Sequence, residues 1–130
     1  MKKGVYLVLF VLCCAVGRAQ SADDRAGIER AILNYVEAFY EADTAKAYAS
    51  VATDLAKRGY YRQNGQVNEA KMSFDQLVQL SKRWKNSQKI TPESPKKITI
   101  LDVLDTIASA KVEALWGIDY FHLAKVNGSW

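Results

Sequence analysis

The chain has few of the residue types that build metal sites or covalent cross-links. Its 130 residues include one histidine, two cysteines and two prolines. Both cysteines, Cys13 and Cys14, lie in an apolar N-terminal run. Without that run the remaining chain has no thiol, which excludes disulfides and thiolate metal sites there. One histidine without cysteines also supplies too few of the usual ligands for a zinc site. We therefore expect no metal in the folded domain.

The sequence also lacks the motifs that bind nucleotides or activate a nucleophile. It contains no GxGxxG, no P-loop, and no Ser-His-Asp set with a recognisable nucleophile turn. Lysine and arginine are scattered rather than arranged in a stripe, so nothing indicates a nucleic-acid partner. We expect no cofactor and no nucleic acid.

Residues 1–19 have the features of a secretory signal peptide. A basic start precedes a short apolar run, Val5 to Val16, and Gly17-Arg18-Ala19 has small residues at two positions before an expected cleavage point after Ala19. A membrane anchor is the alternative, but the apolar run is too short to cross about 30 Å of hydrocarbon. We predict cleavage after Ala19 and export to a bacterial periplasm or beyond, with no stable membrane anchor afterwards. An exported domain without disulfides suits that location.

Removal of this leader changes the charge balance. The full chain has a formal net charge of +4 and a pI of about 9.1. The leader holds three of the 18 basic residues and no acid, so the mature chain has 15 basic and 14 acidic side chains. The basic pI belongs largely to the leader. Residues 20–130 are enough for one domain with its own core.

The first part of this domain predicts helices. A hydroxyl and two acids at Ser21–Asp24 predict a helix start. Apolar residues then recur at spacings of three and four: Ile28, Ala31, Ile32, Tyr35, Ala38, Phe39 and Ala42. This spacing predicts a helix of about five turns with one broad apolar face. Asp43-Thr44 interrupts the pattern and predicts the cap of a second, short helix.

A hairpin and a third helix are expected next. Asn64-Gly65 lies between two strand-like segments and predicts a tight hairpin turn. Ser73 predicts the cap of a helix whose apolar side includes Leu77 and Trp84. The polar segment from Asn86 to Lys96 contains both prolines and predicts an exposed connector.

The C-terminal stretch from Lys97 to Trp130 predicts antiparallel strands. Apolar, β-branched and aromatic residues alternate in three runs, over 98–103, 110–115 and 118–126. Gly117 predicts a turn or bulge between the last two runs. Asn127-Gly128 predicts another tight turn, and Ser129-Trp130 would begin a fourth strand. Helices first and strands last predict an α+β fold with the helices on one face of a sheet.

This order of elements, with DLAKRGYY at Asp54–Tyr61 and DYFHLAKVNGSW at Asp119–Trp130, resembles the putative lumazine-binding family of the NTF2-like (SnoaL-like) superfamily. The resemblance covers residues 20–130. It implies a cone, in which a curved antiparallel sheet wraps around a long N-terminal helix and leaves a cavity, and it implies a homodimer through the sheet. Two features depart from the pattern: residues 50–53 lack a histidine, and the final strand expected after Trp130 is missing, so we expect either a fragment or a sheet with one strand fewer.

The catalytic candidates are His122, Asp54 and Tyr120. Strand alternation places His122 on one face with Tyr120. Beside an acid such as Asp54, His122 would act as a general base, which is chemistry that the resemblance implies for some relatives. The alternative, which we favour, is a core or interface histidine satisfied by its neighbours, because no acid at strand spacing marks a dyad.

Two acids have competing interpretations. Asp119 lies on the opposite face from the histidine, and we expect it to pair across the sheet with Lys111 or Lys125. Asp54, close to Lys57-Arg58, is either a pocket acid or, more typically, part of a capped turn with solvated charges.

Aromatic richness suits a flat ligand. The candidate ligand-binding residues are Tyr35, Phe39, Tyr60, Trp84, Trp116, Tyr120 and His122. Each alone is more typical of an ordinary core, whereas together they favour a hollow lined by rings. We predict an exported, non-catalytic domain that binds a small apolar or aromatic molecule or dimerises. A cofactor-free isomerase or dehydratase with a histidine base is the alternative, and an interaction module with a filled cavity is a third hypothesis.

Overall fold

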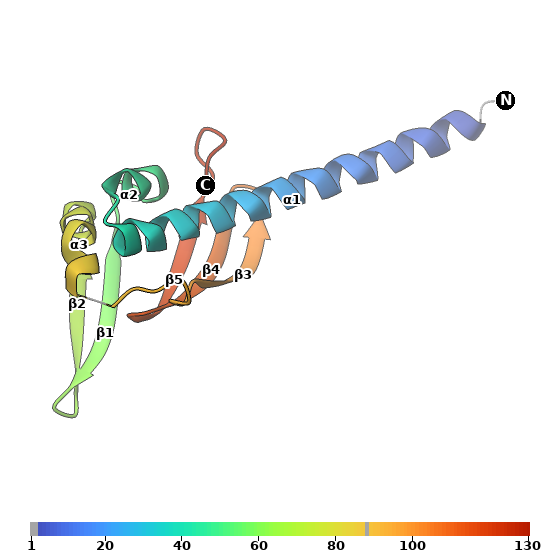
Figure 1. The fold of residues 1–130 in the computed structure, drawn as a ribbon. Coiled ribbons are helices and arrows are strands. Elements are labelled where there is room, and N and C mark those ends of the chain that lie inside the picture. Colours follow the sequence, from blue (N-terminus) through green and yellow to red (C-terminus); the bar gives the residue numbers. More distant parts are fainter. Residues whose placement is uncertain (1–2, 88) are drawn as a thin grey trace.

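The computed structural model describes residues 3–87 and 89–130, with side chains from residue 22 onward except at 86 and 87. In chain order the elements are α1 (Lys3–Glu41), α2 (Thr44–Ser50), β1 (Lys57–Gln63), β2 (Gln66–Met72), α3 (Phe74–Ser87), β3 (Lys97–Leu104), β4 (Ile107–Ala114) and β5 (Gly117–Ala124) (Figure 1). The predicted α+β order, with helices before the main sheet, is confirmed. Within the described part of the chain, no helix has the length and apolarity that crossing a membrane requires.

Helix α1 is longer than predicted. It runs without a break from Lys3 to Glu41, so the helix start expected at Ser21 is wrong. No proline interrupts this stretch, and its leucines and alanines favour continued helix. Its first half extends beyond the rest of the domain (Figure 1). The signal peptide predicted over residues 1–19 falls where no side chains are described, and at residues 1 and 2 nothing is described, so cleavage stays a prediction.

The ends of α1 and α3 follow their local sequence. Ala42 has a positive φ of 59°, which ends α1, and Asp43 then caps α2 by accepting a hydrogen bond from the backbone N–H of Ala45 at 2.9 Å. Ser73 and Gln76 form a reciprocal capping box at the start of α3, with distances of 3.3 and 2.9 Å. Both predicted caps are confirmed.

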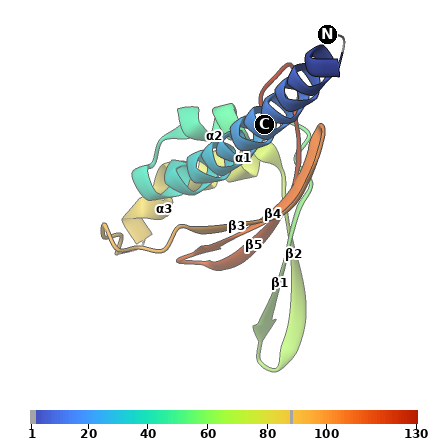
Figure 2. The same ribbon diagram turned by 90° about the vertical axis from the view of Figure 1, so that its right-hand side faces the viewer.

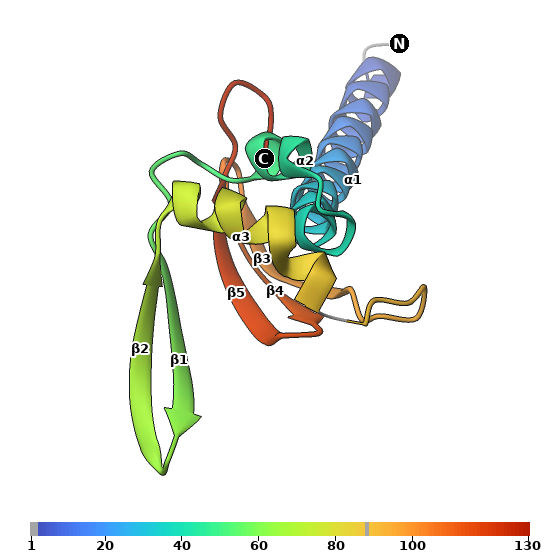
Figure 3. The same ribbon diagram turned by 60° about the vertical axis from the view of Figure 1, so that its left-hand side comes forward.

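Strands β1 and β2 form the predicted hairpin. They pair antiparallel from Lys57–Met72 to Gln63–Gln66. Asn64 and Gly65 have φ angles of 53° and 79°, as a two-residue turn of this kind requires. The hairpin projects away from the helices (Figure 3), and it is a separate sheet in the strand order.

The second sheet has the order β3-β4-β5, all antiparallel. A register shift between Ile100 and Asp102 explains why β3 has apolar residues at both parities: Leu101 is exposed, while Val103 packs against the core. Gly117 has a φ of 121° at the start of β5, which confirms the expected turn. After β5 the predicted fourth strand is reduced to one isolated bridge between Val126 and Ser129.

The core lies between α1 and one face of the β3–β5 sheet, which curves beneath the helix (Figure 2). The α1 face contributes Ile28, Ile32 and Val36, all almost fully buried. Every second residue of β4 is small and faces them: Ala108, Ala110, Val112 and Ala114. Small side chains there allow the helix to approach the sheet closely. This arrangement agrees with the curved-sheet cone implied by the resemblance.

Candidate functional site

Four of the predicted ligand residues lie together in one buried aromatic cluster. Tyr35, Phe39, Trp84 and Trp116 contact one another and also Tyr40 and Phe121. Their ring centroids lie 5.2 to 6.1 Å apart, which is the range of direct ring contact. The rings are therefore packed against each other as part of the core.

The other predicted residues lie elsewhere. Tyr60 on β1 is 69% exposed, and Tyr120 on β5 is 72% exposed. His122 is exposed on the face of β5 that points away from α1, and its Nδ1 lies 3.3 Å from the hydroxyl of Ser109 on β4. The structure therefore does not bring these three side chains into the aromatic cluster.

The polar centre of the aromatic cluster is the carboxylate of Asp119. Its Oδ2 accepts hydrogen bonds from the Tyr35 hydroxyl (2.7 Å), the Lys57 ammonium (2.7 Å) and the Trp116 indole N–H (2.8 Å). The Lys57 ammonium also donates to the Tyr35 oxygen at 2.5 Å. The cluster thus ties the start of β1 to α1 and β5.

The predicted partner of Asp119 is wrong. Asp119 lies opposite Val112 on the face that points to α1, whereas Lys111 lies on the other face and bonds Glu113. Lys125 lies beyond the end of β5 and pairs with Asp24 on α1. Alternation along a strand identifies a face, but not which element lies against that face.

The charges in this cluster are fixed by their surroundings. Burial raises the pKa of the Tyr35 hydroxyl, and the neighbouring Asp119 charge raises it further. Burial alone would raise the pKa of Asp119, but the hydrogen bond and charge of Lys57, helped by Tyr35 and Trp116, outweigh it and lower that pKa. At neutral pH the cluster contains the neutral Tyr35 phenol beside the Asp119–Lys57 ion pair. These groups are bonded to one another, so we expect them to stabilise the fold.

Asp54 does not join this cluster. It is exposed in the turn between α2 and β1. The basic residues near it pair with other acids: Lys57 with Asp119, and Arg58 with Glu69 at 3.8 Å. These contacts favour the solvated-turn interpretation of Asp54.

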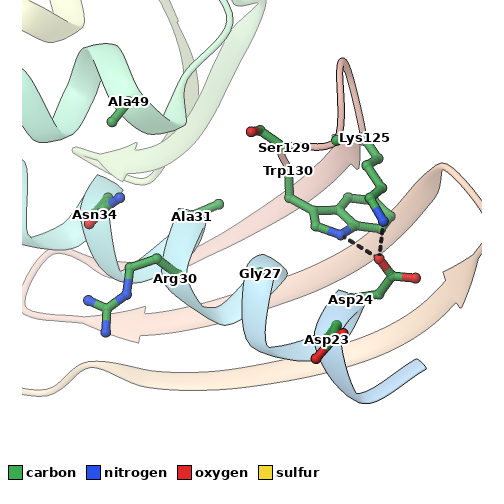
Figure 4. Close-up of a pocket in the computed structure, with 11 residues that line it drawn as sticks. Asp23, Asp24, Gly27, Arg30, Ala31, Asn34, Ala49, Lys125, Ser129 and Trp130 are labelled. Carbon is green, nitrogen blue, oxygen red and sulfur yellow. Dashed lines mark hydrogen bonds and ion pairs between the residues drawn. The ribbon is translucent and has the colours of Figure 1, made fainter. Parts of the chain in front are cut away.

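A pocket of about 340 Å³ opens between α1, α2 and the turn that follows β5 (Figure 4). It is lined by Asp23, Asp24, Gly27, Arg30, Ala31, Asn34, Ala49, Lys125, Gly128, Ser129 and Trp130. Oδ1 of Asp24 accepts hydrogen bonds from the Lys125 ammonium at 2.5 Å and from the Trp130 indole N–H at 3.2 Å. Asp24 is only 8% exposed, so this carboxylate holds the indole in place from within the fold.

Gly27 lets the Trp130 ring lie directly on α1. A Cβ at this position would be 2.7 Å from Cδ1 of Trp130, closer than side chains approach in folded proteins. The glycine costs helix stability of about 1 kcal/mol relative to alanine. Its position in the helix interior therefore has a packing reason, which is the close approach of the indole.

The open half of the pocket lies beside this indole. In Figure 4, Ala31 and Ala49 line this half, Asn34 lies at its far end, and Arg30 lies at its rim. Among the described residues, Arg30 and Asn34 have no hydrogen-bond or ion-pair partner. Unpaired donors beside an oriented aromatic ring are features of small-molecule sites.

A family model described as putative lumazine-binding matches residues 23–130. The chain belongs to the putative lumazine-binding family. Membership places it in the NTF2-like superfamily and indicates a small-molecule-binding module. No curated protein and no solved structure matches the chain significantly. The family match spans Asp23 to Trp130 and so includes every residue that lines the pocket.

This putative lumazine-binding domain has a pocket that sequence reasoning missed. Its wall residues lie more than 90 positions apart in the chain, on α1 and after β5. Two local signals bear on it: Gly27 in the middle of an amphipathic helix, and the Asn127-Gly128 turn that directs Trp130 back toward the domain. Neither signal alone identifies its partner.

The domain has a second, smaller pocket of about 220 Å³ next to His122. Leu104, Ile107 and Leu123 line it, with Asp102 and Ser109 as polar neighbours. In the described ranges, no three potential metal ligands come together. The row from Asp102 through Ser109 to His122 places the hydroxyl between the acid and the imidazole, which is not the order of a Ser-His-Asp triad.

Proposed function

We propose that this member of the putative lumazine-binding family is an exported, non-catalytic domain that binds a small planar molecule between α1 and the turn after β5. The observation that carries the proposal is the 340 Å³ pocket beside the oriented Trp130 indole. Its volume lies at the lower end of small-molecule sites, about 300 to 1,000 Å³. The buried aromatic cluster, by contrast, is filled by its own rings.

A non-catalytic role is supported by the state of the ionisable groups. The histidine that an isomerase or dehydratase would use is exposed on the outer face of the sheet, with Ser109 as its neighbour. Two acids lie inside the fold: Asp119 already accepts three hydrogen bonds and has a lowered pKa, and Asp24 accepts hydrogen bonds from Lys125 and Trp130. A carboxylate held in this way is a poor proton acceptor for a substrate.

Export and self-association complete the proposal. Export rests on the leader pattern over residues 1–19. The homodimer would form through the β3–β5 sheet, whose surface carries large apolar side chains that are more than half exposed: Leu101, Leu104, Ile107, Ile118 and Tyr120. Exposed apolar side chains gathered on one sheet suit a symmetric interface.

The first experiment tests export. The full chain is expressed in a bacterial host, the cells are fractionated, and the N-terminus of the exported form is sequenced. We expect a form that begins at Gln20. Retention of the full chain in the cytoplasm would contradict export.

Light scattering on the recovered form then measures its mass, and we expect that of a dimer.

The second experiment tests the pocket. A library of planar heteroaromatic compounds is screened by thermal shift against the recovered protein, Trp130→Ala and Tyr60→Ala. Ligands that bind the folded state raise its melting temperature. We expect stabilisation that Trp130→Ala abolishes and Tyr60→Ala, the exposed aromatic control on the β1–β2 hairpin, keeps. Stabilisation that survives in Trp130→Ala would place the ligand elsewhere, and the absence of any stabilising compound would count against ligand binding.

A further inference from the structure

We propose that this pocket selects planar molecules with one negative charge, an aromatic carboxylate being the simplest, with the ring against Trp130 and the anion beside Arg30 and Asn34. This inference rests on the proposed function, because it assumes that the pocket between α1 and the turn after β5 is the ligand site. It adds the charge of the ligand and its orientation.

The expected position of the ligand's ring against Trp130 follows from the way the indole is held. Asp24 accepts the indole N–H, and Gly27 allows the Cδ1 edge of the ring to lie against the helix. With this edge held on the helix, the indole lines the pocket beside its open half (Figure 4). A ring already fixed by two contacts loses little conformational freedom when a flat molecule stacks on it.

The expected negative charge of the ligand follows from which ionic groups in the pocket wall are already paired. Asp24 and Lys125 form an ion pair at 2.5 Å, so together they add no net charge to the pocket. This leaves Arg30 and Asp23 as the unpaired charges on its wall. They are seven positions apart on α1, about 10 Å along the axis, and Figure 4 shows Asp23 on the other side of Trp130 from Asn34.

The open half of the pocket therefore has a donor end. Arg30 and Asn34 are four residues apart on α1 and so lie on the same face of the helix. A guanidinium binds a carboxylate through two parallel hydrogen bonds, and an amide N–H adds a third donor. The small side chains of Ala31 and Ala49 leave room for a ring between this end and Trp130.

Three probes with the same ring and different charge test the inference: indole-3-acetate, indole-3-acetamide and tryptamine. Their dissociation constants are measured by calorimetry at low salt with the wild-type protein, Arg30→Gln and Arg25→Gln. Arg25 is an exposed arginine on α1 that does not line the pocket, so it is the matched control. Melting curves without ligand check that all three proteins are folded.

We expect the acid to bind roughly two- to fivefold more tightly than the amide, since an exposed charge pair contributes on that scale. The amine should bind most weakly. Arg30→Gln should remove the preference for the acid, and Arg25→Gln should keep it.

Equal or tighter binding of the amide or amine, or a preference that survives Arg30→Gln, would overturn the inference and leave the pocket as the site. If none of the three binds while library compounds bind in a Trp130-dependent way, the ligand class is wrong; if no compound binds at all, the proposed function fails with it.

Discussion

The ion pair between Lys57 and Asp119 should contribute strongly to stability, and Asp119→Asn tests this. The substitution keeps the shape of the side chain but removes its charge, leaving the Lys57 ammonium without a counter-ion. Removing one partner of a buried pair costs about 3 to 5 kcal/mol. The Lys57 and Asp119 side chains are 24% and 19% exposed, so water reaches both. We therefore expect a smaller loss, about 2 kcal/mol, and a melting temperature lower by roughly 10 °C.

A double-mutant cycle separates the pair from its surroundings. Lys57→Met, Asp119→Asn and the double variant are unfolded in urea, and the free energies of unfolding are compared. Because the second substitution removes a charge that the first has already left unpaired, the double variant should be more stable than the sum of the single losses predicts. We expect a coupling energy of about 1 to 2 kcal/mol.

The pH dependence has a definite sign. The pKa of Asp119 is lower in the folded protein, so its contribution is present above the unfolded pKa, about 3.9, and is lost as the pH falls through the folded value. Asp119→Asn should lack this part of the acid unfolding profile. Asp54→Asn, which removes an exposed carboxylate in the turn before β1, is the control and should leave the urea midpoint unchanged. Wild-type stability in Asp119→Asn, or additive single losses, would refute the reasoning.

Three further substitutions have defined outcomes. Tyr40→Phe removes the hydrogen bonds that join α1 to the connector before β3 and to the β4–β5 turn. Urea unfolding should show a free energy of unfolding that is lower by about 1 to 2 kcal/mol. An unchanged urea midpoint would contradict this prediction. Gly65→Ala places a side chain at a φ of 79°, which should destabilise the hairpin turn by about 1 kcal/mol and speed up amide exchange in the β1–β2 hairpin accordingly. Gly59→Ala is the control, because the space at Gly59 is open and the substitution should not weaken the turn. Gly27→Ala should displace the Trp130 ring and shift its fluorescence without lowering global stability, because alanine favours the helix; an unchanged spectrum would show that the close contact is absent in solution.

The local elements of this protein were determined by its sequence. The amphipathic spacing from Ile28 onward, the caps at Asp43 and Ser73, and the turn at Asn64-Gly65 all act within a few residues, and the structure confirms each of them. Strand alternation likewise predicted the three strands of the main sheet. The helix start at Ser21 failed because a capping pattern does not end a helix when the residues before it are also helix formers.

The contacts that make the candidate site were decided only by the tertiary structure. Asp119 bonds Tyr35 from 84 positions away and Lys57 from 62, and Asp24 holds Trp130 across 106 positions. Periodicity predicts which face a side chain occupies, but it contains no information about which element will cover that face. Four of the seven residues that suggested a ligand became core for this reason, and the pocket formed where a glycine on α1 meets a tryptophan after β5.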